Sequence, residues 1–168
     1  MKVNFNKIPL AGREVEYIKE AIASGHLQGD GEFLKKCEAA LRAATKAKAA
    51  LLTTSCTSAL DMAALLCDIK SGDEVIVPTF TFVSSVNAFV LRGAKPVFCD
   101  IRPDTLNIDE SQIPQLLTKR TKAVVPVHYA GVGCEMDTIM ETAKSAGIRV
   151  VEDAAQGVCA YYKGRHLG

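Results

Sequence analysis

The chain has 168 residues, of which 48% are apolar, so it is long enough for about one globular domain and too apolar to be mainly disordered. Its formal net charge is +1 with acidic and basic residues interspersed, which excludes the strongly basic surface that binds nucleic acid or an anionic membrane. No apolar stretch approaches the roughly 20 residues that cross a bilayer, and the first residues lack the apolar core of a signal peptide, so we expect a cytoplasmic protein with no membrane contact.

Two helices without a strand between them are predicted at the start of the chain. Apolar residues recur at helical spacing over residues 12–24, and Gly25 follows as a stop signal. A flexible turn then leads into a second helix over residues 32–44. We expect residues 1–46 to form these leading helices, which would pack on the main body or on a partner.

From residue 47 onward the pattern changes to alternating strands and helices. Short apolar or β-branched runs predict strands at 50–53, 74–77, 97–99, 123–127 and 149–151. Helical spacing between them predicts helices at 59–66, 83–92, 109–117 and 137–146, with Pro114 disturbing the third. This order predicts an α/β fold, with a mostly parallel, helix-covered sheet and right-handed crossovers, in one domain whose α/β body is 47–168. The tail, residues 158–168, is turn-rich, and we expect no helix or strand in it.

The six cysteines give no sign of a disulfide framework or a zinc site. They contain no Cys-x-x-Cys pair, and most lie in apolar segments. In a reducing cytosol such residues are typically small buried hydrophobic side chains. Three histidines are too scattered along the sequence to suggest a metal cluster.

The stretch Val150–Gln156 is the strongest candidate for a ligand contact. An apolar run closes there on Glu152 and Asp153. A buried parallel strand delivers polar groups in this way to the carboxyl edge of its sheet, where open α/β sheets bind ligands. Asp153 is therefore the best single candidate, although a residue that only caps the next turn would give the same pattern.

Three further loops follow predicted strands at the same edge. The Ser/Thr-rich turn at 54–58 precedes a helix, whose free N–H groups and dipole attract anions, although simple N-capping is the commoner use of such turns. The loop 78–84 carries aromatic residues that could stack on a planar ring or pack in the core. His128 and Tyr129 follow the next strand, and the histidine could contact a substrate or satisfy a loop carbonyl.

Taken together, these loops favour a small, planar, monophosphorylated cofactor. A carboxylate that faces a ring nitrogen keeps that nitrogen protonated, which in pyridoxal phosphate (PLP) chemistry makes the ring an electron sink. Neither Gly-x-Gly-x-x-Gly nor the Walker phosphate loop follows any predicted strand, so a doubly wound nucleotide-binding domain is disfavoured.

The motifs of the chain, read in order, resemble one enzyme family. The sequence carries Thr-Ser-Cys-Thr-Ser-Ala-Leu, Gly-Asp-Glu-Val-Ile-Val-Pro, Phe-Val-Leu-Arg-Gly-Ala-Lys-Pro-Val-Phe, Pro-Val-His-Tyr-Ala-Gly and Val-Glu-Asp-Ala-Ala-Gln. As a set they resemble the DegT/DnrJ/EryC1/StrS aminotransferases, PLP enzymes of the aspartate-aminotransferase fold (PLP fold type I). The resemblance implies part of the large domain of that fold, a homodimer, and amino transfer from glutamate to a 4-keto nucleotide sugar. A dTDP-4-keto-6-deoxy sugar, used in surface polysaccharide biosynthesis, is the expected substrate.

The resemblance also implies how the cofactor would be held. Ser55, Cys56 and Thr57 would bind the phosphate of PLP, largely through backbone N–H groups. Phe82 would lie against the ring, and Asp153 would pair with its nitrogen. No metal ligand is expected.

Gln156 would lie beside the ring near its hydroxyl group, and His128 and Tyr129 would line the substrate pocket. The family's Schiff-base lysine lies downstream of the motif Lys-Gly-Arg-His-Leu-Gly, with which this sequence ends, so no catalytic residue is expected within residues 1–168. The small domain is expected to be absent as well. We therefore expect a truncated chain that is inactive alone. The alternative is a non-catalytic PLP-binding or subunit-pairing module.

Overall fold

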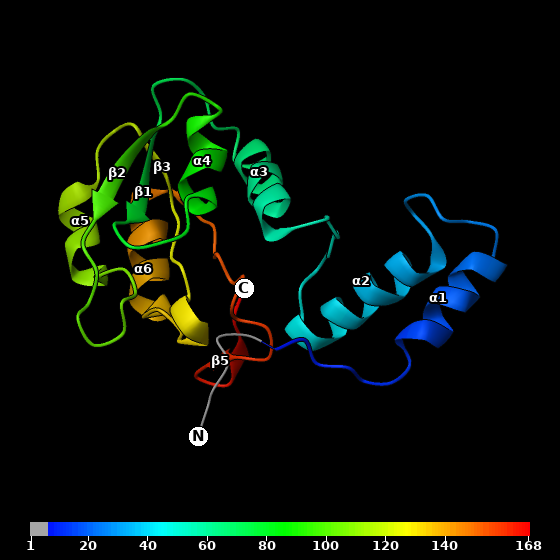
Figure 1. Ribbon diagram of the computed structural model, residues 1–168. Coiled ribbons are helices and arrows are strands. Elements are labelled where there is room, and N and C mark those ends of the chain that lie inside the picture. The colour runs from blue at the N-terminus through cyan, green and yellow to red at the C-terminus, as the bar shows by residue number, and fades with distance from the viewer. Residues whose placement is uncertain (1–6) are drawn as a thin grey trace. The chain divides into compact units, whose positions relative to one another are not determined.

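A four-stranded parallel sheet forms the centre of residues 53–168 (Figure 1). The computed structural model describes residues 7–168. The strand order is β2-β1-β3-β4, and each neighbouring pair is parallel. The strands are β1 (Glu74–Pro78), β2 (Lys95–Cys99), β3 (Thr121–Val124) and β4 (Arg149–Val150). This sheet confirms the predicted fold class.

Helices cover both faces of the sheet, and β1 shows why its sequence is apolar throughout. All five residues of β1 are buried. Val75 and Val77 pack against α3 (Cys56–Leu66) and α4 (Ser84–Val90), whereas Ile76 lies in the cluster on the opposite face. That face is covered by α5 (Ile113–Leu116) and α6 (Met136–Ala146). Alternate side chains of one strand thus enter two cores, as expected for a strand buried on both sides.

Proline and glycine set the limits of two of these helices. The segment predicted as one helix over 109–117 divides into a 3-10 turn, η1 (Glu110–Gln112), and the short helix α5. Pro114 lies in the first turn of α5, where its missing N–H costs no intrahelical bond. Helix α6 ends at Gly147, whose φ of 68° is left-handed and favours glycine.

Two expectations about regular structure were wrong. Residues 50–53 form no strand: a strand needs a neighbour for its backbone hydrogen bonds, and no described strand pairs with this segment. Conversely, the tail contains a hairpin of β5 (Tyr161–Tyr162) and β6 (Arg165–His166). Lys163 and Gly164 between them have φ angles of 49° and 78°, as a two-residue hairpin turn requires.

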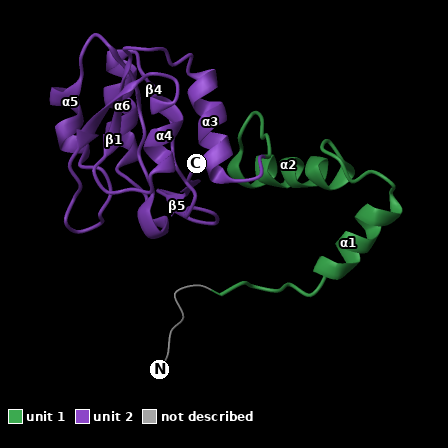
Figure 2. Cartoon of the chain, turned by 45° about the horizontal axis from the view of Figure 1, so that its top comes forward, with its two compact units in different colours: residues 1–52 green, residues 53–168 purple. Residues whose placement is uncertain are grey.

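The leading helices belong to a separate compact unit, residues 1–52 (Figure 2). They are α1 (Glu14–Ala23) and α2 (Glu32–Thr45), which confirms the two predicted helices. The rings of Tyr17 and Phe33 join them, with centroids 5.5 Å apart. Helix α2 ends at Lys46, which has a left-handed φ of 62°. None of the helices in the described part of the chain is long and apolar enough to cross a bilayer.

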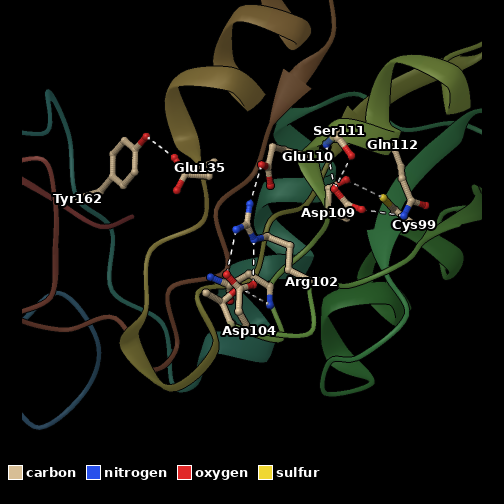
Figure 3. Close-up of polar contacts among 11 residues, drawn as sticks. Cys99, Arg102, Asp104, Asp109, Glu110, Ser111, Gln112, Glu135 and Tyr162 are labelled. Carbon is tan, nitrogen blue, oxygen red and sulfur yellow. Dashed lines mark hydrogen bonds and ion pairs between the residues drawn. The ribbon is translucent and has the colours of Figure 1, made fainter.

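An ion-pair network fixes the loop that follows β2 (Figure 3). The Arg102 guanidinium donates to both carboxylate oxygens of Asp104, at 3.1 and 2.9 Å, and to Oε1 of Glu110, at 2.9 Å. Asp109 caps η1, and the hydrogen bonds from Ser111 and Gln112 lower the pKa of its carboxyl group. The loop is therefore held by its own side chains, and it carries a residue that supports the candidate site.

Candidate functional site

The backbone of Asp153 extends the sheet beyond the ends of its strands. Val127 and Asp153 form an isolated parallel bridge, which continues the pairing of β3 with β4. The Asp153 N–H donates to the Pro126 carbonyl at 2.9 Å, and the His128 N–H donates to the Asp153 carbonyl at 3.1 Å. The carboxylate is therefore held at the carboxyl edge of the sheet, where the sequence predicted it.

The side chain of Asp153 is buried and receives donors from three directions. Its Oδ2 accepts a hydrogen bond from Ser85 Oγ at 2.6 Å. Its Oδ1 accepts one from the Ala155 N–H at 3.1 Å and lies 3.7 Å from Cys56 Sγ. Within residues 7–168 no lysine, arginine or histidine forms an ion pair with it. The Ala155 contact is the predicted cap. Because no cationic side chain pairs with the carboxylate among these residues, a positively charged ligand atom could serve as its partner.

The amino terminus of α3 carries two free backbone donors beside this carboxylate. Ser55 is the N-cap residue, and its Oγ accepts the Ser58 N–H at 3.2 Å. The Thr53 hydroxyl donates to the Ser55 carbonyl at 2.7 Å and fixes the turn. No acceptor within the described residues receives the N–H groups of Cys56 and Thr57. The turn therefore caps the helix and also leaves two donors at the positive end of the helix dipole, as an anion site requires.

A small pocket of about 110 Å³ opens next to Asp153. Phe82 lies on its wall with 73% of its surface exposed, and Gln156 lies on it with its Oε1 accepting the Ala130 N–H at 2.6 Å. The pocket is lined by Thr81, Phe82, Val127, His128, Tyr129, Asp153, Ala155 and Gln156. The structure thus brings Phe82, Asp153, Gln156, His128 and Tyr129 together around one cavity. The lining does not include Ser55, Cys56 or Thr57, although Cys56 contacts one lining residue, Asp153, through its Sγ.

His128 uses both ring nitrogens inside the protein. Its Nδ1 accepts the Cys134 N–H at 3.1 Å, so the ring proton lies on Nε2, which donates to Oε2 of Glu152 at 2.8 Å. Burial raises the pKa of Glu152, but the hydrogen bonds from His128 and the Gly168 N–H outweigh it and leave that pKa below its ordinary value. Neither ring nitrogen binds the loop carbonyl that the sequence offered as the alternative for His128: the partners are a backbone N–H and a carboxylate. Contact of His128 with a substrate stays a prediction.

Tyr129 is positioned by the loop after β2. Asn107 is buried, and its Oδ1 accepts the Tyr129 N–H at 3.0 Å while its Nδ2 donates to the Val132 carbonyl at 3.0 Å. The Tyr129 ring contacts Phe80 edge-on, with centroids 5.0 Å apart. The Arg102 N–H donates to the Asn107 carbonyl at 2.8 Å, so the residue at the centre of the ion-pair network also helps to hold Asn107.

The sequence reading missed Ser85, which forms the shortest contact to Asp153. The candidate loop predicted from the sequence, 78–84, ends one position before Ser85. The available signal was a hydroxyl residue four positions after Thr81, at the start of a predicted helix that follows a strand at the ligand-binding edge.

The residues at this edge fit PLP better than they fit a metal. In the part of the chain that the structure describes, no group of three His, Cys, Asp or Glu side chains could hold a metal ion. A phosphate matches the free donors of Cys56 and Thr57, a flat ring matches the exposed face of Phe82, and a protonated ring nitrogen matches the buried carboxylate of Asp153.

Comparisons with known proteins show which family the chain resembles. The model of the DegT/DnrJ/EryC1/StrS aminotransferase family matches residues 10–168. The chain is 43% identical over 162 residues to the spore coat polysaccharide biosynthesis protein SpsC of Bacillus subtilis, covering 96% of the chain and 41% of that protein. It is 38% identical over 159 residues to the GDP-perosamine synthase of Escherichia coli O157:H7, covering 95% of the chain and 44% of that protein.

A solved structure supports the fold. The aminotransferase from Psychrobacter cryohalolentis superposes with a TM-score of 0.90 at 37% identity, covering 95% of this chain and 41% of that one. The chain therefore spans less than half the length of the relatives that it matches.

Proposed function

The chain belongs to the DegT/DnrJ/EryC1/StrS aminotransferase family, and we propose that the protein transfers an amino group to a nucleotide-linked keto sugar with PLP as cofactor. PLP is the cofactor of this family. The observation that carries the proposal is the buried carboxylate of Asp153, which has no cationic partner among residues 7–168 and lies next to the donor-rich start of α3.

Different residues of this chain would bind the ring and the phosphate of the cofactor. When bound, PLP supplies a protonated pyridine ring that accepts electrons from the substrate carbon during amino transfer. Asp153 would keep the proton on the ring nitrogen, because a carboxylate next to that nitrogen favours its charged form. The N–H groups of Cys56 and Thr57 would bind the phosphate, with Ser55 fixing the turn.

Two pocket residues would set the orientation of the ring. Phe82 would cover one face of the ring and keep water from it. Gln156 would lie near the ring hydroxyl, and its link to the Ala130 N–H limits its movement. We assign no residue of 1–168 to the proton transfer itself, which in this family belongs to the Schiff-base lysine.

The substrate class rests on relatives and on local motifs. We propose a 4-keto nucleotide sugar as amino acceptor and glutamate as donor, in the biosynthesis of a surface polysaccharide. The relatives named for GDP-perosamine synthesis and spore coat polysaccharide support this class. The stretches 29–31, 55–57 and 134–137 resemble dTDP-4-amino-4,6-dideoxygalactose transaminase, so we propose a dTDP-4-keto-6-deoxy sugar. We also propose that the protein works as a homodimer, as the family does.

Absorbance and product analysis test this function in a complete protein, one that carries residues 1–168 together with the family's Schiff-base lysine. PLP should bind with a shifted absorbance band, and glutamate should then convert the cofactor to its amino form. Addition of a dTDP-4-keto-6-deoxy sugar should restore the original band and yield an aminated sugar nucleotide, detected by mass spectrometry. A protein that binds no PLP, or binds it without any glutamate-dependent change, would contradict the proposal.

A further inference from the structure

Two hydroxyl groups form a hydrogen-bonded series that ends at the carboxylate of Asp153. Ser85, in the first turn of α4, is fully buried, and its Oγ lies 2.6 Å from Asp153 Oδ2. Thr81, four residues earlier and half-buried, places its Oγ1 2.7 Å from Ser85 Oγ. Thr81 also lines the pocket that Phe82 and Asp153 share. The three side chains thus form one connected series from the pocket wall to the buried carboxylate.

The direction of the hydrogen bonds in this series follows from the number of hydrogens. An ionised carboxylate can only accept, so the single hydroxyl hydrogen of Ser85 points to Asp153. Ser85 then has no second hydrogen and must accept from Thr81. Both hydroxyl dipoles therefore point their positive ends toward the carboxylate, and the bond from Ser85 fixes the position of Oδ2.

The other donors to Asp153 cannot replace this series. The Ala155 N–H binds Oδ1 and belongs to the turn of Asp153 itself, so it moves with that residue. Cys56 Sγ lies 3.7 Å from the same oxygen, and a thiol is a weak donor. Ser85 supplies the only hydrogen bond found to Oδ2 among the described residues, and it comes from a different element of the fold.

We propose that Ser85, supported by Thr81, is a positioning residue that fixes the plane of the Asp153 carboxylate toward the ring nitrogen of the bound cofactor. The inference rests on the proposed function, because it concerns how the same site controls the ring. It adds that the electron-accepting state of the ring depends on two hydroxyl groups that do not touch the ring nitrogen.

Substitutions in the same complete protein, loaded with PLP that is labelled with ¹⁵N in the ring, test this inference. The ¹⁵N chemical shift reports whether the ring nitrogen is protonated, independently of turnover. In Ser85→Ala we expect a larger unprotonated fraction at a given pH than in the wild type. We also expect the glutamate half-reaction to slow by roughly 10- to 100-fold, the usual effect of losing a hydrogen bond to a charged group.

The neighbouring hydroxyl residues provide matched controls. Ser84→Ala removes a buried hydroxyl from the same turn that does not contact Asp153, and it should leave the ¹⁵N shift and the half-reaction unchanged. Thr81→Val should change both in the same direction as Ser85→Ala, but less, whereas Thr81→Ser keeps the hydroxyl and should restore them. If Ser85→Ala fails to fold, the comparison of Thr81→Val with Thr81→Ser still tests the inference.

A wild-type ¹⁵N shift and half-reaction rate in both Ser85→Ala and Thr81→Val would overturn the inference and leave the proposed function intact. A wild-type protein that binds no PLP would instead overturn the proposed function and this inference together. The two failures are therefore distinguishable in a single series of samples.

Discussion

Cys56 Sγ lies 3.7 Å from Asp153 Oδ1, although the two residues are 97 positions apart in the sequence. Cys56 opens α3 and Asp153 follows β4, so the contact joins the helix amino terminus to the buried carboxylate. Partial desolvation of the sulfur where it faces the protein, together with the neighbouring charge of Asp153, raises the pKa of the Cys56 thiol. The thiol therefore stays protonated at neutral pH and acts as a weak hydrogen-bond donor, not as a nucleophile.

Asp153→Asn should separate the chemical role of this residue from its structural one. The amide keeps the size of the side chain and an oxygen that can accept from Ser85, so we expect nearly unchanged folding by circular dichroism. It cannot keep a ring nitrogen protonated, so in the complete protein that carries the Schiff-base lysine the half-reaction with glutamate should slow by roughly 100-fold or more in stopped-flow absorbance. A near-normal rate would show that Asp153 only caps its own turn through the Ala155 N–H.

Thr57→Pro, compared with Thr57→Ala, should show which atoms bind the phosphate. Thr57 lies in the first turn of α3, where proline is compatible with a helix but removes the free N–H and disfavours the helical conformation of Cys56. We expect Thr57→Pro to weaken PLP binding by roughly tenfold or more, since a hydrogen bond to a charged group is lost. Thr57→Ala keeps the N–H and should bind nearly as the wild type does in an absorbance titration. Equal affinities in the two variants would place the phosphate elsewhere.

The elements predicted correctly from the sequence are those whose own residues show the apolar run of a strand or the spacing of a helix. The buried strand β1 is apolar at every position after Glu74, and α6 has both helical spacing and Gly147 at its end. The place of Asp153 at the carboxyl edge of the sheet was predicted because an acidic residue there directly follows an apolar strand. That pattern has few explanations other than a cap or a ligand contact. These signals are local, so one sequence was enough.

What the sequence could not predict depends on residues far away in the chain. Whether residues 50–53 form a strand is decided by a partner strand, which their own composition does not reveal. The strands β5 and β6 have two residues each, too few for any periodicity. Ser85 and Asp153 are 68 positions apart, so their contact follows only from the packing of α4 on the sheet.

Exposed cysteines should react with a thiol reagent faster than buried ones. The expectation that most are buried was wrong, since Cys37, Cys56 and Cys159 are exposed. Cys99 and Cys134 are buried, and burial raises the pKa of both thiols to about 12. At pH 8 iodoacetamide should therefore modify Cys37 and Cys159 first and leave Cys99 and Cys134 unmodified until the protein unfolds, as read by peptide mass spectrometry.

Cys56 should react slowly for an exposed thiol, because partial desolvation of its sulfur and the charge of Asp153 both disfavour its thiolate. Bound PLP should slow its modification further by covering the start of α3. Modification of Cys134 as fast as Cys159 in the folded protein would contradict the burial of the loop that His128 and Cys134 share.

The pair of His128 and Glu152 should make the stability of the protein depend on acid pH. The folded-state pKa of Glu152 lies below its ordinary value of about 4.3, so this group stabilises the fold fully above that pH. As the pH falls further, the unfolded chain takes up a proton at this position before the folded chain does. The stabilisation should therefore decline and be lost once the pH passes the lowered pKa.

Glu152→Gln removes this titration but keeps an oxygen that accepts the Nε2–H of His128, so it isolates the effect of the charge. We expect its urea midpoint to fall less than that of the wild type between pH 6 and about pH 3, since other carboxyl groups titrate equally in both. Glu141→Gln, at an exposed position of α6, serves as control and should follow the wild type. Parallel pH profiles of wild type and Glu152→Gln would show that the charge of Glu152 does not stabilise the fold and that the contact with His128 acts through its geometry alone.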